Sequence, residues 1–177
     1  MAVPEARLRA TRFGLAPDGE GWFVLNAVES RWRDFGRFGA GCDFEGERPF
    51  RQLGVNLNVL GPGEPLGMYH RENHQEGFLV LSGECMLIVE EEERPLRQWD
   101  YFHCPAGTRH VVAGAGDGPC AILMLGARPE VEKLLYPVSD VAAKYGASVA
   151  TETSDPDAAY ADWPGEYQPV RLPWPVG

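Results

Sequence analysis

The strongest constraint on the fold is a series of short apolar segments between residues 55 and 125, separated by turn-forming residues. In the first segment, Val55, Leu57 and Val59 alternate with asparagines, which is the period-2 pattern of a strand with one apolar face. Turn signals then recur about every 8–12 residues, the spacing of an all-β sandwich or barrel. Further strands are expected at residues 77–81, 85–89, 95–98, 101–104, 109–113 and 121–125. The sequence therefore predicts an all-β fold.

The N-terminal segment differs from this central region. Residues 1–21 are polar and contain glycines, so we expect an arm, whereas residues 22–28 have the composition of a strand. Residues 29–51 mix arginines with aromatic side chains, a composition that favours contacts with another surface and that a dimer contact explains most simply. We interpret residues 1–54 as an arm with strands that pack on the barrel or on a partner.

The C-terminal segment changes character again after the last expected strand. Short helices are expected at residues 139–145 and 155–161, because each begins with a capping residue and Gly146 can end the first. The tail, which we expect to be extended, contains Pro164, Pro169, Pro173 and Pro175. The chain is thus interpreted as one domain, with a barrel over residues 55–128 and short helices with a Pro-rich tail over residues 129–177.

The composition limits the partners and the cellular location. The net charge of −10 and the pI of about 4.8 make nucleic acids and anionic membranes unlikely partners. None of the four cysteines forms a Cys-x-x-Cys pair, so reduced, structural cysteines are expected. Residues 1–20 lack an apolar signal core, and no run of about 18 apolar residues could span a bilayer. We therefore expect a cytoplasmic protein.

Three of the four histidines lie in two short segments, residues 67–76 and 105–110. Residues two apart on a strand share a face, so His70 lies on the face of Glu72, and Glu76 lies on the face of Phe78. A carboxylate that points into an apolar interior is costly unless it is paired or binds a cation. With His110 delivered from another strand, these imidazoles and carboxylates suit a divalent first-row metal ion.

The same residues resemble the two motifs of the cupin family. The first motif reads Gly-x5-His-x-His-x(3,4)-Glu-x6-Gly, and this sequence has His70-x-Glu72-x3-Glu76-x6-Gly83. The second reads Gly-x5-Pro-x-Gly-x2-His-x3-Asn, and this sequence has Trp99-x5-Pro105-x-Gly107-x2-His110-x3-Gly114. The departures are Glu72 in place of the second histidine, Trp99 in place of the leading glycine and Gly114 in place of the closing asparagine. The resemblance covers residues 55–126.

The resemblance implies a single cupin double-stranded β-helix, a jelly-roll-like barrel, that binds a divalent metal ion through His70, Glu76 and His110. The spacing favours Glu72 as the fourth ligand, whereas a bulge near residue 73 would bring His74 inward instead. Two histidines with two carboxylates favour Mn or Fe, and Zn and Ni stay open. The alternative is a barrel that has lost its metal, with Glu72 marking the loss. The family resemblance also implies that a homodimer is common.

Other residues near the two segments carry weaker expectations. The expected substrate-pocket residues are Met68, Tyr69 and Phe78, with ordinary core packing as the alternative for the first two. Cys104 is expected to pack in the core, because nothing beside it in sequence would lower its pKa. Arg109 points away from His110 on a strand, so a surface salt bridge is favoured over a clamp for a substrate carboxylate. His74 is otherwise expected in an exposed turn.

Three functions fit these features. The favoured one is a metal-dependent enzyme that acts on a small molecule, an oxygenase first and a sugar isomerase second, because open positions on a His/carboxylate metal suit dioxygen chemistry. The second is a non-catalytic small-ligand-binding module, and the third is an interaction protein whose arms are the working parts. The fold itself does not choose among them. No helix-turn-helix pattern accompanies the barrel, so a DNA-binding role is not expected.

Overall fold

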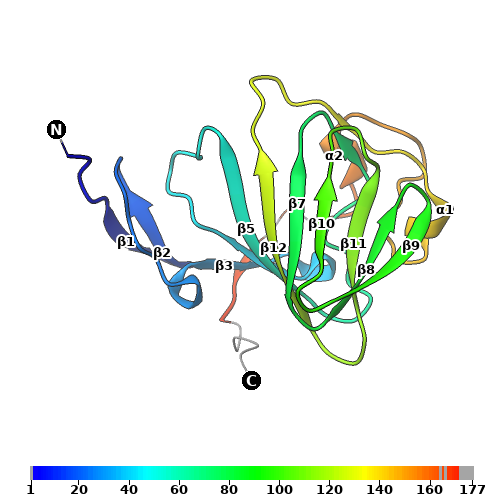
Figure 1. Cartoon of the computed structure of the whole chain (residues 1–177), viewed down its shortest axis with the longest axis horizontal. Coiled ribbons are helices and arrows are strands. Elements are labelled where there is room, and N and C mark those ends of the chain that lie inside the picture. Colours follow the sequence, from blue (N-terminus) through cyan, green and yellow to red (C-terminus); the bar gives the residue numbers. More distant parts are fainter. Residues whose placement is uncertain (1, 164, 166, 172–177) are drawn as a thin grey trace.

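The structure is a computed structural model that describes residues 2–163, 165 and 167–171. Its centre consists of two antiparallel sheets that face each other (Figure 1). Within the described residues, the large sheet has the order β10 (Tyr101–Cys104), β7 (Glu76–Ser82), β12 (Cys120–Ala127), β5 (Leu53–Leu60), β4 (Ala40–Asp43), β3 (Arg31–Asp34) and β14 (Gln168–Pro169). The small sheet has the order β11 (His110–Ala115), β8 (Glu84–Val89) and β9 (Glu92–Arg97).

The main hydrophobic core lies between these sheets. Its buried members come from both sides, for example Phe78 and Ile122 from the large sheet and Leu87 and Val112 from the small one. All the strands expected between residues 55 and 125 are present, with ends shifted by a few residues. The period-2 pattern predicted these strands because each of them has one face against this core. The fold is all-β, as predicted, with the arrangement of a double-stranded β-helix.

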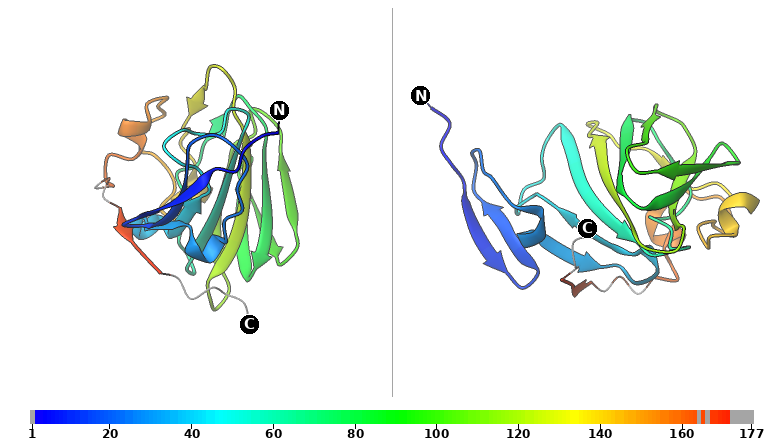
Figure 2. Two further views of the ribbon diagram at one scale, coloured as in Figure 1. Left: turned by 90° about the vertical axis from the view of Figure 1, so that its left-hand side faces the viewer. Right: turned by 60° about the horizontal axis from the view of Figure 1, so that its bottom comes forward.

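The N-terminal arm contains a hairpin of β1 (Arg7–Thr11) and β2 (Gly14–Asp18) that projects from the barrel (Figures 1 and 2). The strand predicted at residues 22–28 is wrong, because only Trp22 makes a bridge and residues 27–29 form the 3-10 helix η1 (Ala27–Glu29). The Asn26 side chain caps that helix by accepting a hydrogen bond from the Val28 amide. Apolar residues of this segment are only partly packed, because Ala27 contacts the cluster around Trp32 and Phe23 stacks on Phe50, whereas Val24 is 79% exposed.

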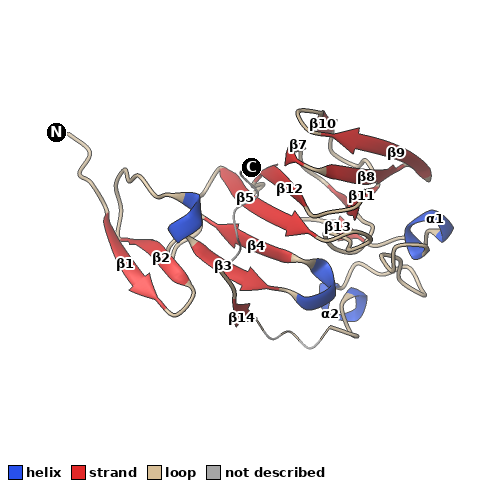
Figure 3. Cartoon of the chain, turned by 90° about the horizontal axis from the view of Figure 1, so that it is seen from below, coloured by secondary structure: helices blue, strands red, loops and turns tan. Residues whose placement is uncertain are grey.

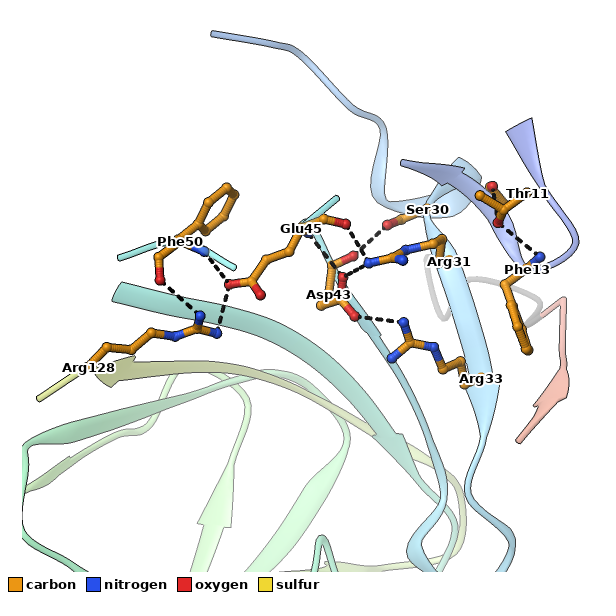
Figure 4. A network of polar contacts seen from close by, with 10 residues as sticks. Thr11, Phe13, Ser30, Arg31, Arg33, Asp43, Glu45, Phe50 and Arg128 are labelled. Carbon is orange, nitrogen blue, oxygen red and sulfur yellow. Dashed lines mark hydrogen bonds and ion pairs between the residues drawn. The ribbon is translucent and has the colours of Figure 1, made fainter. Parts of the chain in front are cut away.

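The arginine-rich segment is held largely by contacts within the chain (Figure 4). Arg31 and Arg33 form ion pairs with the two carboxylate oxygens of Asp43, at 2.5 and 3.1 Å. Glu45 forms an ion pair with Arg128 at 2.7 Å, which ties this segment to the end of β12. These contacts attach the strands β3 and β4 to the barrel, with the 3-10 helix η2 (Gly36–Phe38) between them.

The C-terminal segment folds back along the barrel, with β13 (Leu134–Leu135) paired to β6 (Arg71–Glu72). The two short helices are α1 (Asp140–Ala143), which Ser139 caps, and α2 (Pro156–Ala159), which Asp155 caps. Both lie away from the N-terminal hairpin (Figure 3). Helix α2 ends two residues before the predicted Ala161, because the chain leaves the helical conformation at Tyr160.

Pro169 lies in β14, the edge strand of the large sheet, whereas Pro164, Pro173 and Pro175 lie outside the described residues. Among the helices of the described residues, none has the length and the apolar character that crossing a bilayer requires.

Candidate metal centre

Two histidines from distant parts of the sequence are held side by side by the backbone. His70 directly precedes β6 and His110 begins β11, and each backbone N–H donates to the carbonyl of the other, at 3.1 and 2.8 Å. Their ring centroids are 4.9 Å apart. Glu76 begins β7 in the large sheet and is 8% exposed, on the same face as the buried Phe78. The three side chains therefore lie close together, Glu76 from the large sheet, His110 from the small sheet and His70 from the segment before β6.

The hydrogen bonds of the two imidazoles define their tautomers. Nδ1 of His70 lies 2.7 Å from the carbonyl oxygen of Met68, and Nδ1 of His110 lies 3.1 Å from that of Thr108. A carbonyl oxygen can only accept, so each Nδ1 carries the proton and donates it. A neutral imidazole then presents the lone pair of Nε2, which is the form that ligates a metal ion when Nδ1–H is held by a carbonyl.

Both Nε2 atoms face carboxylate oxygens. Nε2 of His110 is buried without a hydrogen-bond partner and lies 3.2 Å from Oε2 of Glu76. Nε2 of His70 lies 3.3 Å from Oε1 of Glu72. A lone pair beside a carboxylate oxygen is repulsive unless a proton or a metal ion lies between them. One ligand atom of each of His70, Glu76 and His110 lies within 4.8 Å of the others, so these residues fit a divalent cation.

The choice between Glu72 and His74 has a geometric basis. Glu72 lines the central cavity, whereas His74 lies behind Glu72, with its Nε2 2.5 Å from Oε2 of that carboxylate. His74 is not an exposed turn residue as expected, because its side chain is only 9% exposed. Glu72 is therefore placed to contribute to the centre, and His74 is placed to hold Glu72.

The carboxylates also shift the titration of the site. Burial lowers the pKa of His70. The hydrogen bonds to Glu72 and to the Met68 carbonyl, with the charges of Glu72 and Glu76, raise it by more, so the net pKa is above its usual value near 6.5. Burial raises the pKa of Glu72, and the histidines around it outweigh this effect, so its net pKa is lowered. The neighbouring histidines thus favour the ionised form of Glu72, which is the form that can ligate a cation.

A cavity of about 300 Å³ opens over these side chains. Apart from the ligand candidates, its lining is Asn56, Leu66, Gly67, Phe78, Val111, Val112, Met124, Leu134, Tyr136 and Tyr160. Of the three residues predicted to line a substrate pocket, Phe78 lines this cavity, and Met68 and Tyr69 do not. Met68 is buried among Phe38 and neighbouring residues, and Tyr69 points into another cluster because it alternates with His70.

Tyrosines in the cavity were missed by the sequence reasoning. Tyr136 is 4% exposed, and its ring centroid lies 5.8 Å from that of His70. Burial raises the pKa of Tyr136, so its hydroxyl stays protonated and can donate a hydrogen bond. The hydroxyl of Tyr160 accepts a hydrogen bond from the Met68 amide. No local signal in the sequence assigns these residues to the site, because they come from the segment that folds back after the barrel.

The remaining candidates have structural roles. Cys104 is buried with its sulfur 3.4 Å from Nδ1 of His110, and burial with the charge of Glu76 raises the pKa of its thiol to about 12. This thiol is therefore not an activated nucleophile. Nε and Nη2 of Arg109 both donate to Oε2 of Glu90 at the surface, at 2.8 and 2.5 Å, which is the surface salt bridge that was predicted. Arg109 does not line the cavity.

Comparison with known proteins agrees with this geometry. Residues 56–126 match the sequence profile of the Cupin domain family, and several of the solved structures that resemble this chain are described as cupin proteins. Residues 56–126 are therefore a cupin domain. No curated protein matches the chain significantly.

Three similar solved structures illustrate the extent of the likeness. A cupin-superfamily sugar phosphate isomerase from Silicibacter pomeroyi is 26% identical with a TM-score of 0.50, and the match covers 54% of this chain and 62% of that protein. KdgF from a Halomonas species is 21% identical with a TM-score of 0.52, covering 63% and 97%. An RmlC-like cupin from Shewanella frigidimarina is 15% identical with a TM-score of 0.52, covering 60% and 90%. This chain thus spans less than two thirds of the Silicibacter protein.

Proposed function

We propose that this chain is a metal-dependent enzyme that transforms a small molecule in the cavity, with oxygenase chemistry as the first candidate. The observation that carries the proposal is the convergence of His70, Glu76 and His110 on one point at the cavity wall. Two histidines and one carboxylate with open positions are the donor set of non-haem iron oxygenases. These residues would hold a divalent ion such as Fe or Mn, which would supply a Lewis acid with open positions at the cavity wall.

The residues of the chain have separate roles in this proposal. His70, Glu76 and His110 hold the cation, and Glu72 supplies a further carboxylate oxygen on the side of His70. The Tyr136 hydroxyl donates a hydrogen bond to a polar group of the substrate. The apolar lining, which includes Phe78 and Val112, excludes water and strengthens the electrostatic interactions inside the cavity.

The lining also limits the substrate class. No lysine or arginine is among the described residues that line the cavity, whereas Glu72 and Glu76 are. A phosphate or carboxylate group on the substrate would meet no cationic side chain there. We therefore propose an uncharged, oxygen-containing substrate of a size that about 300 Å³ admits.

Sugar isomerisation is the second candidate. It is favoured by the likeness to the sugar phosphate isomerase from Silicibacter pomeroyi, at 26% identity. For this chain we propose an unphosphorylated sugar, because the cavity lining lacks the cationic side chains that would bind a phosphate. Glu72 and Tyr136 both line the cavity, and we propose that the Glu72 carboxylate accepts a proton from such a substrate while the protonated Tyr136 hydroxyl donates a hydrogen bond to it.

Metal content and turnover test the proposal together. The purified protein is expected to contain a divalent metal, and His110→Ala is expected to lower the content by one equivalent per chain. The protein loaded with Fe or Mn is then screened for oxygen uptake with small uncharged substrates and for interconversion of free sugars. Unchanged metal content in His110→Ala, or no metal in the wild type even after reconstitution, contradicts the metal centre.

The same screen separates the enzyme from the alternative of a non-catalytic binding module. Ligands that raise the melting temperature without turnover at any metal would favour the module. We place the protein in the cytoplasm, which fits the four buried cysteines that are all free thiols.

A further inference from the structure

Behind the metal centre lies a second group of ligand side chains, Glu72, His74 and Glu132, and we propose that this group binds a second divalent cation. One ligand atom from each of the three lies within 4.8 Å of the others. Two carboxylates and one imidazole form a donor set that Mn²⁺ accepts. We call this group the outer site. It does not depend on the reaction proposed above, but it shares Glu72 with the metal centre.

The two oxygens of Glu72 face the two sites. Oε1 lies 3.3 Å from Nε2 of His70 in the metal centre, and Oε2 lies 2.5 Å from Nε2 of His74 in the outer site. A carboxylate in this position can give one oxygen to each of two cations. The departure of the sequence from the family motif at Glu72 therefore provides a side chain that connects two positions, which a histidine ligand with one coordinating nitrogen would not do.

His74 is not fully satisfied by Glu72. Its side chain is 9% exposed, and the contact with Glu72 uses only Nε2. Nδ1 of His74 is buried without a hydrogen-bond partner. An imidazole held at this depth for structural reasons alone is expected to find partners for both ring nitrogens. A cation coordinated by Nδ1 would supply the interaction that the protein groups do not, while Nε2 keeps its contact with Glu72.

Electrostatics in the group also favour a cation. Glu72 and Glu132 approach each other within the 4.8 Å of the cluster, and the described residues provide no arginine or lysine that forms an ion pair with either carboxylate. Like charges at this separation repel, and a divalent ion between them reverses the sign of the interaction. Glu132 is exposed, so a cation can reach the group from solvent.

Two hydrogen bonds of the Asn73 side chain fix the backbone on either side of Glu132. The side chain of Asn73 donates to the carbonyl of Val131 at 2.9 Å and accepts from the amide of Lys133 at 2.8 Å. These two contacts hold the residues on either side of Glu132 against the segment that carries Glu72 and His74. The outer site is thus formed by the fold, at the point where the segment after β12 returns to β6.

The test measures binding of Mn²⁺ to the metal-free full-length protein at about pH 7.5, above the ordinary pKa of a free imidazole. Wild type is compared with Glu132→Gln, with His110→Ala, and with Glu130→Gln as a matched control in the same segment. We expect wild type and Glu130→Gln to bind a second Mn²⁺ per chain. Glu132→Gln is expected to lose the second ion and keep the first, and His110→Ala to lose the first and keep the second.

Electron paramagnetic resonance of the loaded proteins tests whether the two ions are adjacent. Two Mn²⁺ ions that share Glu72 are expected to give a spectrum broadened by their coupling, and Glu132→Gln is expected to give the narrower spectrum of an isolated ion. A Glu132→Gln variant that binds the second Mn²⁺ like wild type overturns the outer site. A wild type that binds one ion, lost in His110→Ala and kept in Glu132→Gln, also overturns it and leaves the metal centre intact. If wild type binds one ion that is lost in Glu132→Gln and kept in His110→Ala, the outer site is supported and the metal centre is contradicted.

Discussion

His110 is constrained at three atoms. Its amide donates to His70, its Nδ1 is held by the Thr108 carbonyl, and its Nε2 faces Glu76. This imidazole can therefore neither rotate nor change tautomer without losing a contact in a fully buried position. A ligand held in this way is ready for a cation before the cation binds, which lowers the cost of ordering it.

Metal binding at this centre is expected to depend on pH through His70. The pKa of His70 is above its usual value near 6.5, so in the metal-free protein the imidazolium stabilises the fold below that value. This contribution is lost as the pH rises through the raised pKa. A metal ion that binds His70 must displace the proton of the imidazolium, so at low pH protonation competes with metal binding and reduces the stabilisation that the metal gives. The gain in melting temperature on adding Mn²⁺ is expected to be larger at about pH 8 than at about pH 6.

Thermal unfolding with Mn²⁺ and with a chelator, at both pH values, measures this gain. His70→Ala serves as the control and is expected to show a smaller gain with a weaker dependence on pH. A gain that shrinks as the pH rises would contradict the assignment of His70 as a ligand.

Arg109 adjoins His110 in sequence, but it binds Glu90 at the surface, so we do not expect it to affect the metal centre. Arg109→Gln is expected to cost no more than about 1 kcal/mol of stability, as for an exposed ion pair. Metal content is expected to be unchanged. Loss of metal in this variant, measured by elemental analysis, would show that the residue acts on the site in a way its contacts do not explain.

At the scale of the elements, β11 meets the turn after β5 at a point without room for a side chain. A Cβ on Gly114 would lie 2.1 Å from the carbonyl oxygen of Gly61, a contact with backbone that cannot easily move. The Gly114 carbonyl also accepts a hydrogen bond from the Gly63 amide at 2.8 Å. The strand and the turn are therefore in direct backbone contact, which explains a glycine where the family motif has asparagine.

Gly114→Ala is expected to destabilise the protein by about 3 kcal/mol, because the strand must move away from the turn. Gly118→Ala is the matched control, since a Cβ there meets no atom within 4 Å, and it is expected to change stability by less than about 0.5 kcal/mol. Urea unfolding of both variants measures the difference. Similar unfolding midpoints for the two would mean that the turn can shift freely.

The barrel strands were predictable because their alternating pattern reflects one buried face, as in β5. A similar apolar composition at Trp22 and Val24 led to the wrong prediction of a strand at residues 22–28. These side chains are exposed, and the pattern carries no information on whether a sheet lies opposite them. Convergence of His70, Glu76 and His110 followed from motif spacing and strand parity. Glu132 and Tyr136 could not be predicted, because the short pairing of β6 with β13 that brings them to the site has only two residues on each strand.

At the scale of the whole molecule, the N-terminal hairpin projects at one end (Figure 2), and apolar side chains before and after it in the sequence are exposed. Val3, Trp22, Val24 and Val28 are all more than half exposed. Trp22 lies beside the start of the chain, since its carbonyl accepts a hydrogen bond from the Ala6 amide at 2.8 Å. Exposed apolar residues in one region are more typical of an interaction surface than of a monomer.

We therefore expect a homodimer that buries this surface. Light scattering of the purified chain is expected to give twice its mass of 19.5 kDa. A Trp22→Lys, Val24→Glu double variant is expected to be monomeric, because charges in an apolar interface are costly to bury. Trp99→Lys is the control, since Trp99 is 67% exposed in the turn between β9 and β10, away from the hairpin. A monomeric wild type would contradict the dimer. A dimer that is dissociated by Trp99→Lys and not by the double variant would place the interface elsewhere. Metal content is expected to be the same in all three proteins, because the ligands come from one chain.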